Sequence, residues 1–132
     1  MALRVEFDPS NKILLLRFDG QLTDDAVAEL YQAIRKHWIA ADASMGIVDF
    51  SSVTDFALSG DLIRKLANQE PCIPDATSRP RVIVAPQAHV FGLTRMFQIL
   101  GETTRPLLSV VHTLDEALAA LGIHSPHFES LQ

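Results

Sequence analysis

The chain has 132 residues, 48% of them hydrophobic and 20% charged, and this composition is typical of a globular domain and excludes general disorder. Lys and Arg total 11 against 16 Asp and Glu, without a basic cluster, so we expect no nucleic-acid partner. The single cysteine, Cys72, excludes an intramolecular disulfide and a Cys-rich zinc site. Because no signal-like segment and no apolar run near ~20 residues occurs, we expect a cytoplasmic protein without a membrane span.

The first third of the chain predicts two strands and a helix. Residues 3–7 alternate apolar and polar side chains, a Pro-Ser-Asn turn follows, and residues 13–18 are nearly all apolar. This pattern predicts a β-hairpin whose second strand is the more buried. Thr23 precedes two aspartates, as at a helix N-terminus. The predicted helix has its apolar face at Val27, Leu30, Tyr31, Ile34 and Trp38.

Strands and helices alternate through the rest of the chain. Strands are predicted over residues 47–50, 82–84 and 107–111, with an irregular loop from Pro71 to Pro80. Thr113 and Glu116 form a capping box for a last helix that Gly122 ends. The apolar positions of the two intervening helices are Leu58, Leu62, Ile63 and Leu66 in the first and Leu93, Phe97 and Leu100 in the second.

This order of elements, ββαβαβαβα, predicts an α/β domain with four main helices and a mixed, mostly parallel five-stranded sheet. We expect one domain over residues 1–123 and a flexible C-terminal tail over 124–132. Residues 13–16 and 107–111 are apolar on both strand faces, whereas right-handed crossovers place the connecting helices on one face. Either a helix crosses to the second face, or a partner subunit, the tail or an apolar ligand covers it.

Three segments carry a resemblance to a known family. Val48-Asp49-Phe50-Ser51-Ser52-Val53-Thr54, leading to Ser59-Gly60, resembles the STAS family of anti-sigma-factor antagonists. The segment from Arg81 through Ala85-Pro86 to Phe97, and the closing helix from Thr113 to Leu121, are similar to its bacterial SpoIIAA-like (STAS/SEC14) branch. The resemblance implies a (βα) superhelical core and a regulatory or binding domain that has no cofactor and is not an enzyme.

The resemblance also implies where a phosphorylation switch would lie. In signalling members, a kinase modifies a serine that directly follows an aspartate, in the loop after the third strand. Aligning this chain from Asp49 to Gly60 without gaps places Ala57 at that aspartate and Leu58 at that serine. Ser59 comes one position later, which on a helix is a turn of about 100°. The domain is therefore not expected to be phospho-switched.

A partner-binding loop is predicted after the third strand, because ligands of open α/β sheets bind at the carboxyl ends of the strands. The alternative is that its hydroxyl groups cap turns and that Ser59 or Asp55 caps the second helix. The residues of the predicted loop are Asp49, Ser51, Ser52, Thr54, Asp55, Ser59 and Gly60.

Phe91 and Arg95 are the predicted interface residues, because the expected inward stripe of the third helix turns them to another side. The alternative for Arg95 is an ion pair with an acid such as Glu102. The two histidines of residues 124–127 have no rigid frame and no acidic third ligand, so no metal site is expected. No local nucleophile motif such as GxSxG occurs.

Two functions remain open at this point. The first is a protein-interaction module, expected as a homodimer with a possible regulatory partner, which predicts an exposed apolar patch and no internal pocket. The second is a carrier of a small apolar or lipid-like ligand, which predicts a cavity beneath the helices.

Overall fold

The structure, a computed structural model, describes residues 2–131. Its strands are β1 (Ala2–Asp8), β2 (Ile13–Thr23), β3 (Met45–Ala57), β4 (Arg81–Val84), β5 (Leu108–Val111) and β6 (Glu129–Ser130). Its helices are α1 (Asp24–Ala41), α2 (Gly60–Asn68), α3 (Ala88–Leu100) and α4 (Leu114–Ala120). The predicted order of elements is confirmed, and one short strand, β6, follows it.

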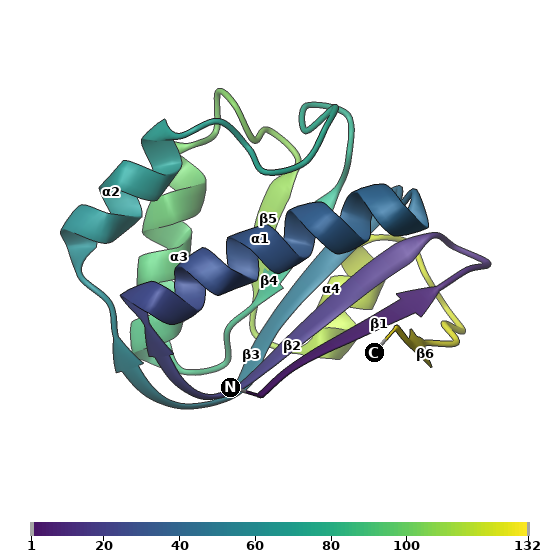
Figure 1. Cartoon of the computed structure of the whole chain (residues 1–132), viewed down its shortest axis with the longest axis horizontal. Coiled ribbons are helices and arrows are strands. Elements are labelled where there is room, and N and C mark those ends of the chain that lie inside the picture. The colour runs from purple at the N-terminus through teal and green to yellow at the C-terminus, as the bar shows by residue number, and fades with distance from the viewer. Residues whose placement is uncertain (1, 132) are drawn as a thin grey trace.

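All the strands join one six-stranded sheet with the order β5-β4-β3-β2-β1-β6 (Figure 1). Strands β2 to β5 are parallel neighbours, whereas β1 runs antiparallel to both β2 and β6. The mixed, mostly parallel sheet is therefore confirmed, with six strands instead of the five predicted. The sixth strand has only two residues, and no apolar alternation marks it in the sequence.

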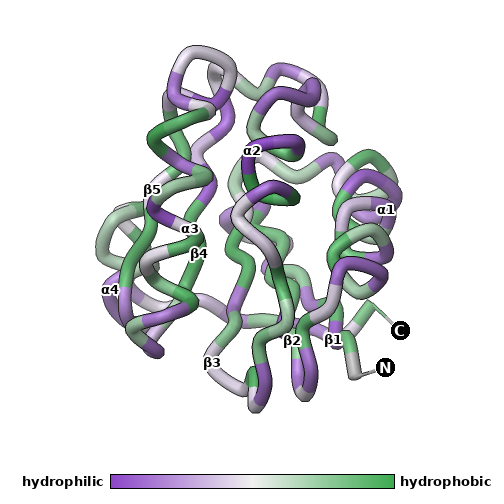
Figure 2. The backbone as a smooth tube through the Cα atoms, turned by 90° about the vertical axis from the view of Figure 1, so that its left-hand side faces the viewer, coloured by the Kyte–Doolittle hydropathy of each residue, from purple (hydrophilic) through white to green (hydrophobic). Residues whose placement is uncertain are grey.

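Helices cover the two faces of the sheet unequally. Helix α1 lies across one face, and α4 lies on the other (Figures 1 and 2). Along β2 the even-numbered side chains Leu14 and Leu16 join the larger core below α1, and the odd-numbered Ile13 and Leu15 join a smaller core with α4. The apolar second face is therefore covered within the chain by helix α4 and by Phe128 of the tail, which are two of the alternatives drawn from the sequence.

The segment expected to be a flexible tail returns to the opposite edge of the sheet from β5. Phe128 packs against the smaller core, and β6 pairs with Glu6 and Phe7 of β1. The backbone N–H of His127 donates a hydrogen bond of 3.3 Å to Asp8 Oδ2. Part of residues 124–132 thus has regular structure, because the unpaired edge of β1 offers hydrogen-bonding groups to a passing chain.

Local sequence signals at the helix ends are confirmed. The side chains of Thr23 and Thr113 accept hydrogen bonds from the N–H groups of Ala26 and Glu116, at 3.2 and 3.1 Å. Gly122, just after α4, has a φ of 73°, a left-handed conformation that glycine adopts without strain. These short-range patterns identify helix ends reliably because each cap involves residues only two or three positions apart.

The inward face predicted for α3 is right for Phe97, which packs against the larger core, and wrong for Leu100. Val90 and Thr94 are its buried residues, whereas Leu100 is 49% exposed. The Thr94 hydroxyl donates to the carbonyl of Val90 at 2.9 Å, so a polar side chain is satisfied inside the helix and occupies the buried stripe. The inward stripe of α3 therefore runs through Val90, Thr94 and Phe97, and an apolar pattern alone does not reveal it because one of its members is a threonine.

Candidate functional site

The predicted partner-binding loop is mostly a strand. Strand β3 continues to Ala57, and its residues Ser52 to Ala57 pair with Asp19 to Thr23 of β2, with one register shift just before this segment and one within it. Strand β4 ends opposite Asp49, so beyond that point β3 has only β2 as a strand neighbour. We call residues 19–23 and 52–57 the β2–β3 arm. Of the predicted site residues, Ser52, Thr54 and Asp55 lie on the arm and are exposed.

The start of the arm is held by two polar side chains. Asp49 is buried and accepts hydrogen bonds from both the N–H and the hydroxyl of Ser51. Gln87, which precedes α3, donates from Nε2 to the carbonyl oxygen of Val53 at 3.1 Å. Beyond Asp49, where β4 no longer pairs with β3, this side-chain amide supplies a hydrogen bond that a neighbouring strand would otherwise make. Asp49, Ser51 and Gln87 thus have structural partners, whereas the exposed residues of the arm remain available to another molecule.

The remaining predicted loop residues lie at the start of α2. Ser59 is the N-cap, and its hydroxyl accepts a hydrogen bond from the N–H of Leu62 at 3.1 Å. Gly60 is the first residue of the helix, and an added Cβ there would meet only Met96 Cε, at 3.8 Å. The capping alternative considered for Ser59 is therefore the one that the structure shows. Asp55 does not cap α2, because it lies on β3 and accepts a hydrogen bond of 3.2 Å from Gln21 Nε2.

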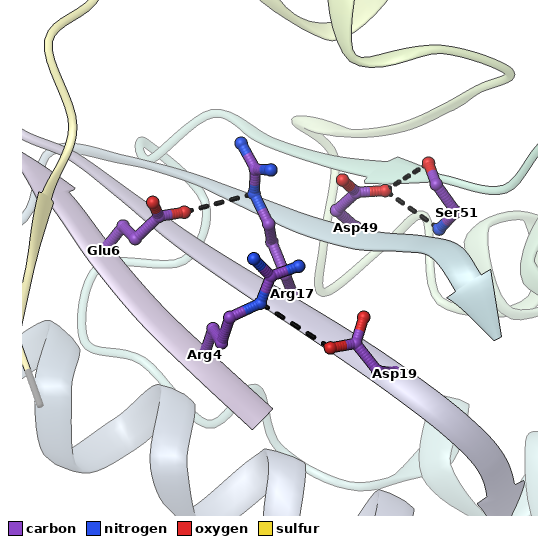
Figure 3. A network of polar contacts seen from close by, with 6 residues as sticks. All are labelled: Arg4, Glu6, Arg17, Asp19, Asp49 and Ser51. Atoms are coloured by element: carbon purple, nitrogen blue, oxygen red, sulfur yellow. Dashed lines mark hydrogen bonds and ion pairs between the residues drawn. The ribbon is translucent and has the colours of Figure 1, made fainter. Parts of the chain in front are cut away.

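A polar network covers the part of the second sheet face away from α4 (Figure 3). Arg17 Nε lies 3.1 Å from Glu6 Oε2, and Arg4 Nε lies 3.6 Å from Asp19 Oδ2. These side chains alternate with core residues along β1 and β2, so they point away from α1. The Arg4–Asp19 pair is exposed and contributes at most ~1 kcal/mol, whereas the interacting atoms of Arg17 and Glu6 are buried. Both pairs keep this part of the face polar, so no second subunit is needed to cover it.

The two predicted interface residues on α3 differ in exposure. Phe91 is half-buried and stacks on His112, with ring centroids 4.1 Å apart and 10° between the ring planes. Arg95 is exposed and donates a hydrogen bond to Gln98 on its own helix. Within residues 2–131 it has no ion pair with Glu102. The exposed large apolar residues near this helix are Ile99, Leu100 and Leu107.

An apolar cavity of about 130 Å³ lies between the sheet and helices α1, α2 and α3. Leu30, Ile34 and Trp38 of α1 form one wall, and Ile63 of α2 and Phe97 of α3 contribute to the others. The floor is formed by side chains of β2, β3 and β4. Helix α2 packs mainly against α3, which leaves this space unfilled below it. This is the cavity beneath the helices that the carrier function predicts.

Five polar side chains lie among the cavity residues: Tyr31, Cys72, Arg81, Thr94 and Arg105. Arg105 is 2% exposed, and its guanidinium donates to the carbonyl oxygens of Leu66, Ala67 and Gln69 at the end of α2. It also lies over the Phe97 ring, 4.8 Å from the centroid. Arg81 donates to the carbonyls of Ala76 and Arg79.

Burial dominates the protonation of these groups. It raises the pKa of Tyr31 to about 12, although Arg105 opposes the shift. Burial also raises the pKa of the Cys72 thiol and lowers the pKa of the Arg81 guanidinium, which nearby Arg105 lowers further. Cys72 is therefore a neutral thiol at pH 7.

Sequence reasoning predicted a cavity beneath the helices only for the carrier function, and it did not identify the arginines that line it. Arg81 begins β4, and Arg105 lies three residues before β5, so both lie at the amino ends of parallel strands. Ligands of open α/β sheets usually bind at the opposite, carboxyl ends of the strands, where the predicted partner-binding loop lies. An arginine next to an apolar strand is only a weak sequence signal for an anion-binding site. Whether a carboxylate neutralises that arginine depends on how the chain packs. Among residues 2–131, no group of three or more His, Cys, Asp or Glu side chains is placed to hold a metal ion.

Comparison with known proteins identifies the fold. No protein-family model matches the chain, and no curated protein matches its sequence. The anti-sigma factor antagonist SpoIIAA in its unphosphorylated form superimposes with a TM-score of 0.60 and 20% identity, over 94% of this chain and all of that one. The phosphorylated form of SpoIIAA, a Bacillus cell fate determinant, superimposes with a TM-score of 0.53 and 18% identity, over 91% of this chain and 99% of that one.

Within residues 2–131, none of the helices is long and apolar enough to cross a membrane. The likeness to SpoIIAA extends over the sheet and the helices that pack on it, and it agrees with the resemblance carried by the sequence motifs. The chain therefore has the SpoIIAA fold over nearly its whole length.

Proposed function

We propose that the protein is a non-catalytic, cytoplasmic regulatory module that acts by binding another protein through the β2–β3 arm. The observation that carries this proposal is the set of exposed polar side chains on the arm. The arm lies at the edge of the sheet where the parallel strands of this SpoIIAA fold have their carboxyl ends. Ser52, Thr54 and Asp55 are exposed there and lie on a strand that has only one strand neighbour. A fixed strand presents such side chains with less loss of entropy on binding than a mobile loop does.

Replacing Thr54 with a photocrosslinking amino acid, in the organism from which the protein comes, tests this proposal by capturing any protein bound to the arm. We expect a discrete adduct with one other protein, because Thr54 is exposed at the centre of the arm. The matched control is the same amino acid at Gln32, which is exposed on α1. No adduct at Thr54, or the same adducts at both positions, would contradict the proposal.

The second candidate function is the binding of a small apolar ligand, and the cavity below α2 favours it. A cavity of about 130 Å³ with a mostly apolar lining can hold a small hydrocarbon. Such a cavity stays dry when it is empty. Ligand binding and partner binding are compatible, because the cavity and the exposed side chains of the arm involve different residues. Native mass spectrometry of gently purified protein tests this function. We expect the mass of the chain plus a bound molecule smaller than a lipid, and the mass of the chain alone would contradict the function.

A further inference from the structure

Two guanidinium groups lie at the cavity without a carboxylate. Arg81 and Arg105 both line it, and within residues 2–131 neither is within 4.0 Å of an acidic side chain. All their assigned acceptors are uncharged oxygen atoms, and Nη1 of Arg81 has none in this part of the chain. The chain carries a net charge of −5, so this local excess of positive charge is not a reflection of its composition.

The arrangement is unfavourable without an anion. Buried charges are normally paired, because neutral carbonyl groups replace only part of the hydration that a cation loses. The two guanidinium groups lie close enough for Arg105 to lower the pKa of Arg81. Arg81 is half-buried, and an anion bound between the cavity and these groups would relieve the repulsion and accept a hydrogen bond from Arg81 Nη1.

We propose that the cavity binds a small amphipathic carboxylate, with its hydrocarbon part among Leu30, Trp38 and Phe97 and its carboxylate at Arg81. This inference rests on the second candidate function and specifies its ligand class. Arg81 begins β4 and lies on the same strand face as Ile83, which packs in the core below α1. Arg105 supplies positive charge nearby while its own hydrogen bonds hold the end of α2.

The size of the cavity limits the hydrocarbon part. An engineered protein cavity of roughly 150 Å³ holds one benzene molecule. A cavity of about 130 Å³ therefore takes a ring or a short chain, and a two-chain lipid does not fit. Hexanoate is a suitable probe because it is small, carries one carboxylate and has a neutral analogue of the same length, hexan-1-ol.

Titration of the whole chain with both probes tests the proposal at neutral pH. Trp38 is the only tryptophan, is buried and lines the cavity, so its fluorescence reports occupancy. Calorimetry of the same titrations gives the two dissociation constants. We expect hexanoate to bind at least about tenfold more tightly than hexan-1-ol, the factor that a charge-assisted hydrogen bond supplies.

Variants of Arg81 identify the group responsible. Arg81→Met removes the charge and should abolish the preference for hexanoate, whereas Arg81→Lys should retain part of it. Arg95→Met is the matched control, because it removes the same charge from an exposed position outside the cavity lining and should leave the preference unchanged. The comparison of hexanoate with hexan-1-ol in the unmodified chain needs no variant, so the test survives if Arg81→Met does not fold.

The outcomes separate the two claims. If hexan-1-ol binds as tightly as hexanoate, the carboxylate proposal is wrong and ligand binding by the cavity stands. If neither probe changes the fluorescence or produces heat, both the proposal and the ligand-binding function fail. A preference for hexanoate that persists in Arg81→Met contradicts the role of Arg81.

Discussion

The Trp38 ring occupies the space where a side chain at Gly46 would begin. A Cβ atom built on Gly46 would lie 2.6 Å from Trp38 Cζ3, closer than such atoms approach in proteins. Gly46 starts β3 next to Met45, and Trp38 is 3% exposed on α1. The close approach of α1 to the sheet therefore depends on a glycine at this position, and it places the tryptophan at the cavity wall.

We expect Gly46→Ala to destabilise the chain by ~1–3 kcal/mol, the usual cost of overpacking, because the rigid ring must move toward the cavity. The emission of Trp38 should change at the same time. Gly92→Ala is the control: no atom lies within 4 Å of its added Cβ, and alanine in a helix interior stabilises by ~0.5–1 kcal/mol. Urea denaturation of the three proteins measures this, and equal midpoints for Gly46→Ala and the parent would contradict it.

Two phenylalanines should differ in their contribution to stability. Phe18 is 2% exposed, so Phe18→Ala should cost ~3–5 kcal/mol, as for a fully buried ring. Phe97 is only half-buried and borders the cavity, so Phe97→Ala should cost less than that. Denaturation curves of both variants test this order, and a larger loss for Phe97→Ala would show that its contact with Arg105 dominates.

Asp8 connects the N-terminal hairpin to the end of the chain. Its carboxylate accepts hydrogen bonds from the N–H groups of Ser10, Asn11 and His127 and from the Asn11 side chain. Burial on its own raises the pKa of Asp8, but these hydrogen bonds outweigh it and the net pKa is lowered. A lowered pKa means that the contribution to stability is complete above the unfolded-state value and is lost as the pH falls through the folded-state value.

We expect Asp8→Ala to lose ~1–3 kcal/mol at neutral pH, because it removes a buried acceptor that receives four hydrogen bonds. The difference from the parent should begin to shrink below about pH 4, the unfolded-state value of an aspartate, and should shrink further as the pH falls through the lowered folded-state value. Denaturation at several pH values measures both effects. Hydrogen exchange at Leu131, whose N–H donates to the carbonyl of Val5, should accelerate in the variant. A stability difference that does not change with pH would contradict the role of the carboxylate.

Ser59 should act as a helix cap and not as a phosphorylation site. Its hydroxyl is engaged with the N–H of Leu62, and Ala57 and Leu58 occupy the positions that the family resemblance assigns to the switch. Ser59→Ala should therefore cost ~1 kcal/mol. Incubation of the parent with an anti-sigma-type kinase should leave Ser59 unmodified, and stoichiometric phosphate there by mass spectrometry would overturn this expectation.

The homodimer expected from the sequence stays a prediction, and sedimentation at micromolar concentration tests it. Phe91→Glu should dissociate a dimer that forms through the face predicted for α3. Leu100→Glu changes a residue that is 49% exposed on the same helix. A monomeric parent rules out the dimer. A dimer that only Leu100→Glu disrupts would move the interface to the end of α3, because Phe91 is already stacked on His112.

The sequence determined those features that depend on near neighbours. Thr23 and Thr113 cap helices through bonds that span three residues, and alternating or continuous apolar runs specified which segments became the central strands. Together with the connection lengths, these signals were sufficient for the order of elements and the largely parallel sheet. The motif around Asp49 and the one from Arg81 to Phe97 then indicated the SpoIIAA fold that the structural comparison found.

Only the tertiary structure decided the features that depend on distant partners. Ser52 to Ala57 extend β3 because β2 supplies hydrogen bonds, although the segment itself reads as a loop. Residues 129–130 form a strand because the edge of β1 is unpaired where the chain passes it. The cavity results from the way in which α1, α2 and α3 pack on the sheet. The same packing places no carboxylate beside Arg81 within residues 2–131. Such features depend on contacts between residues far apart in the chain, which no pattern of neighbouring residues specifies.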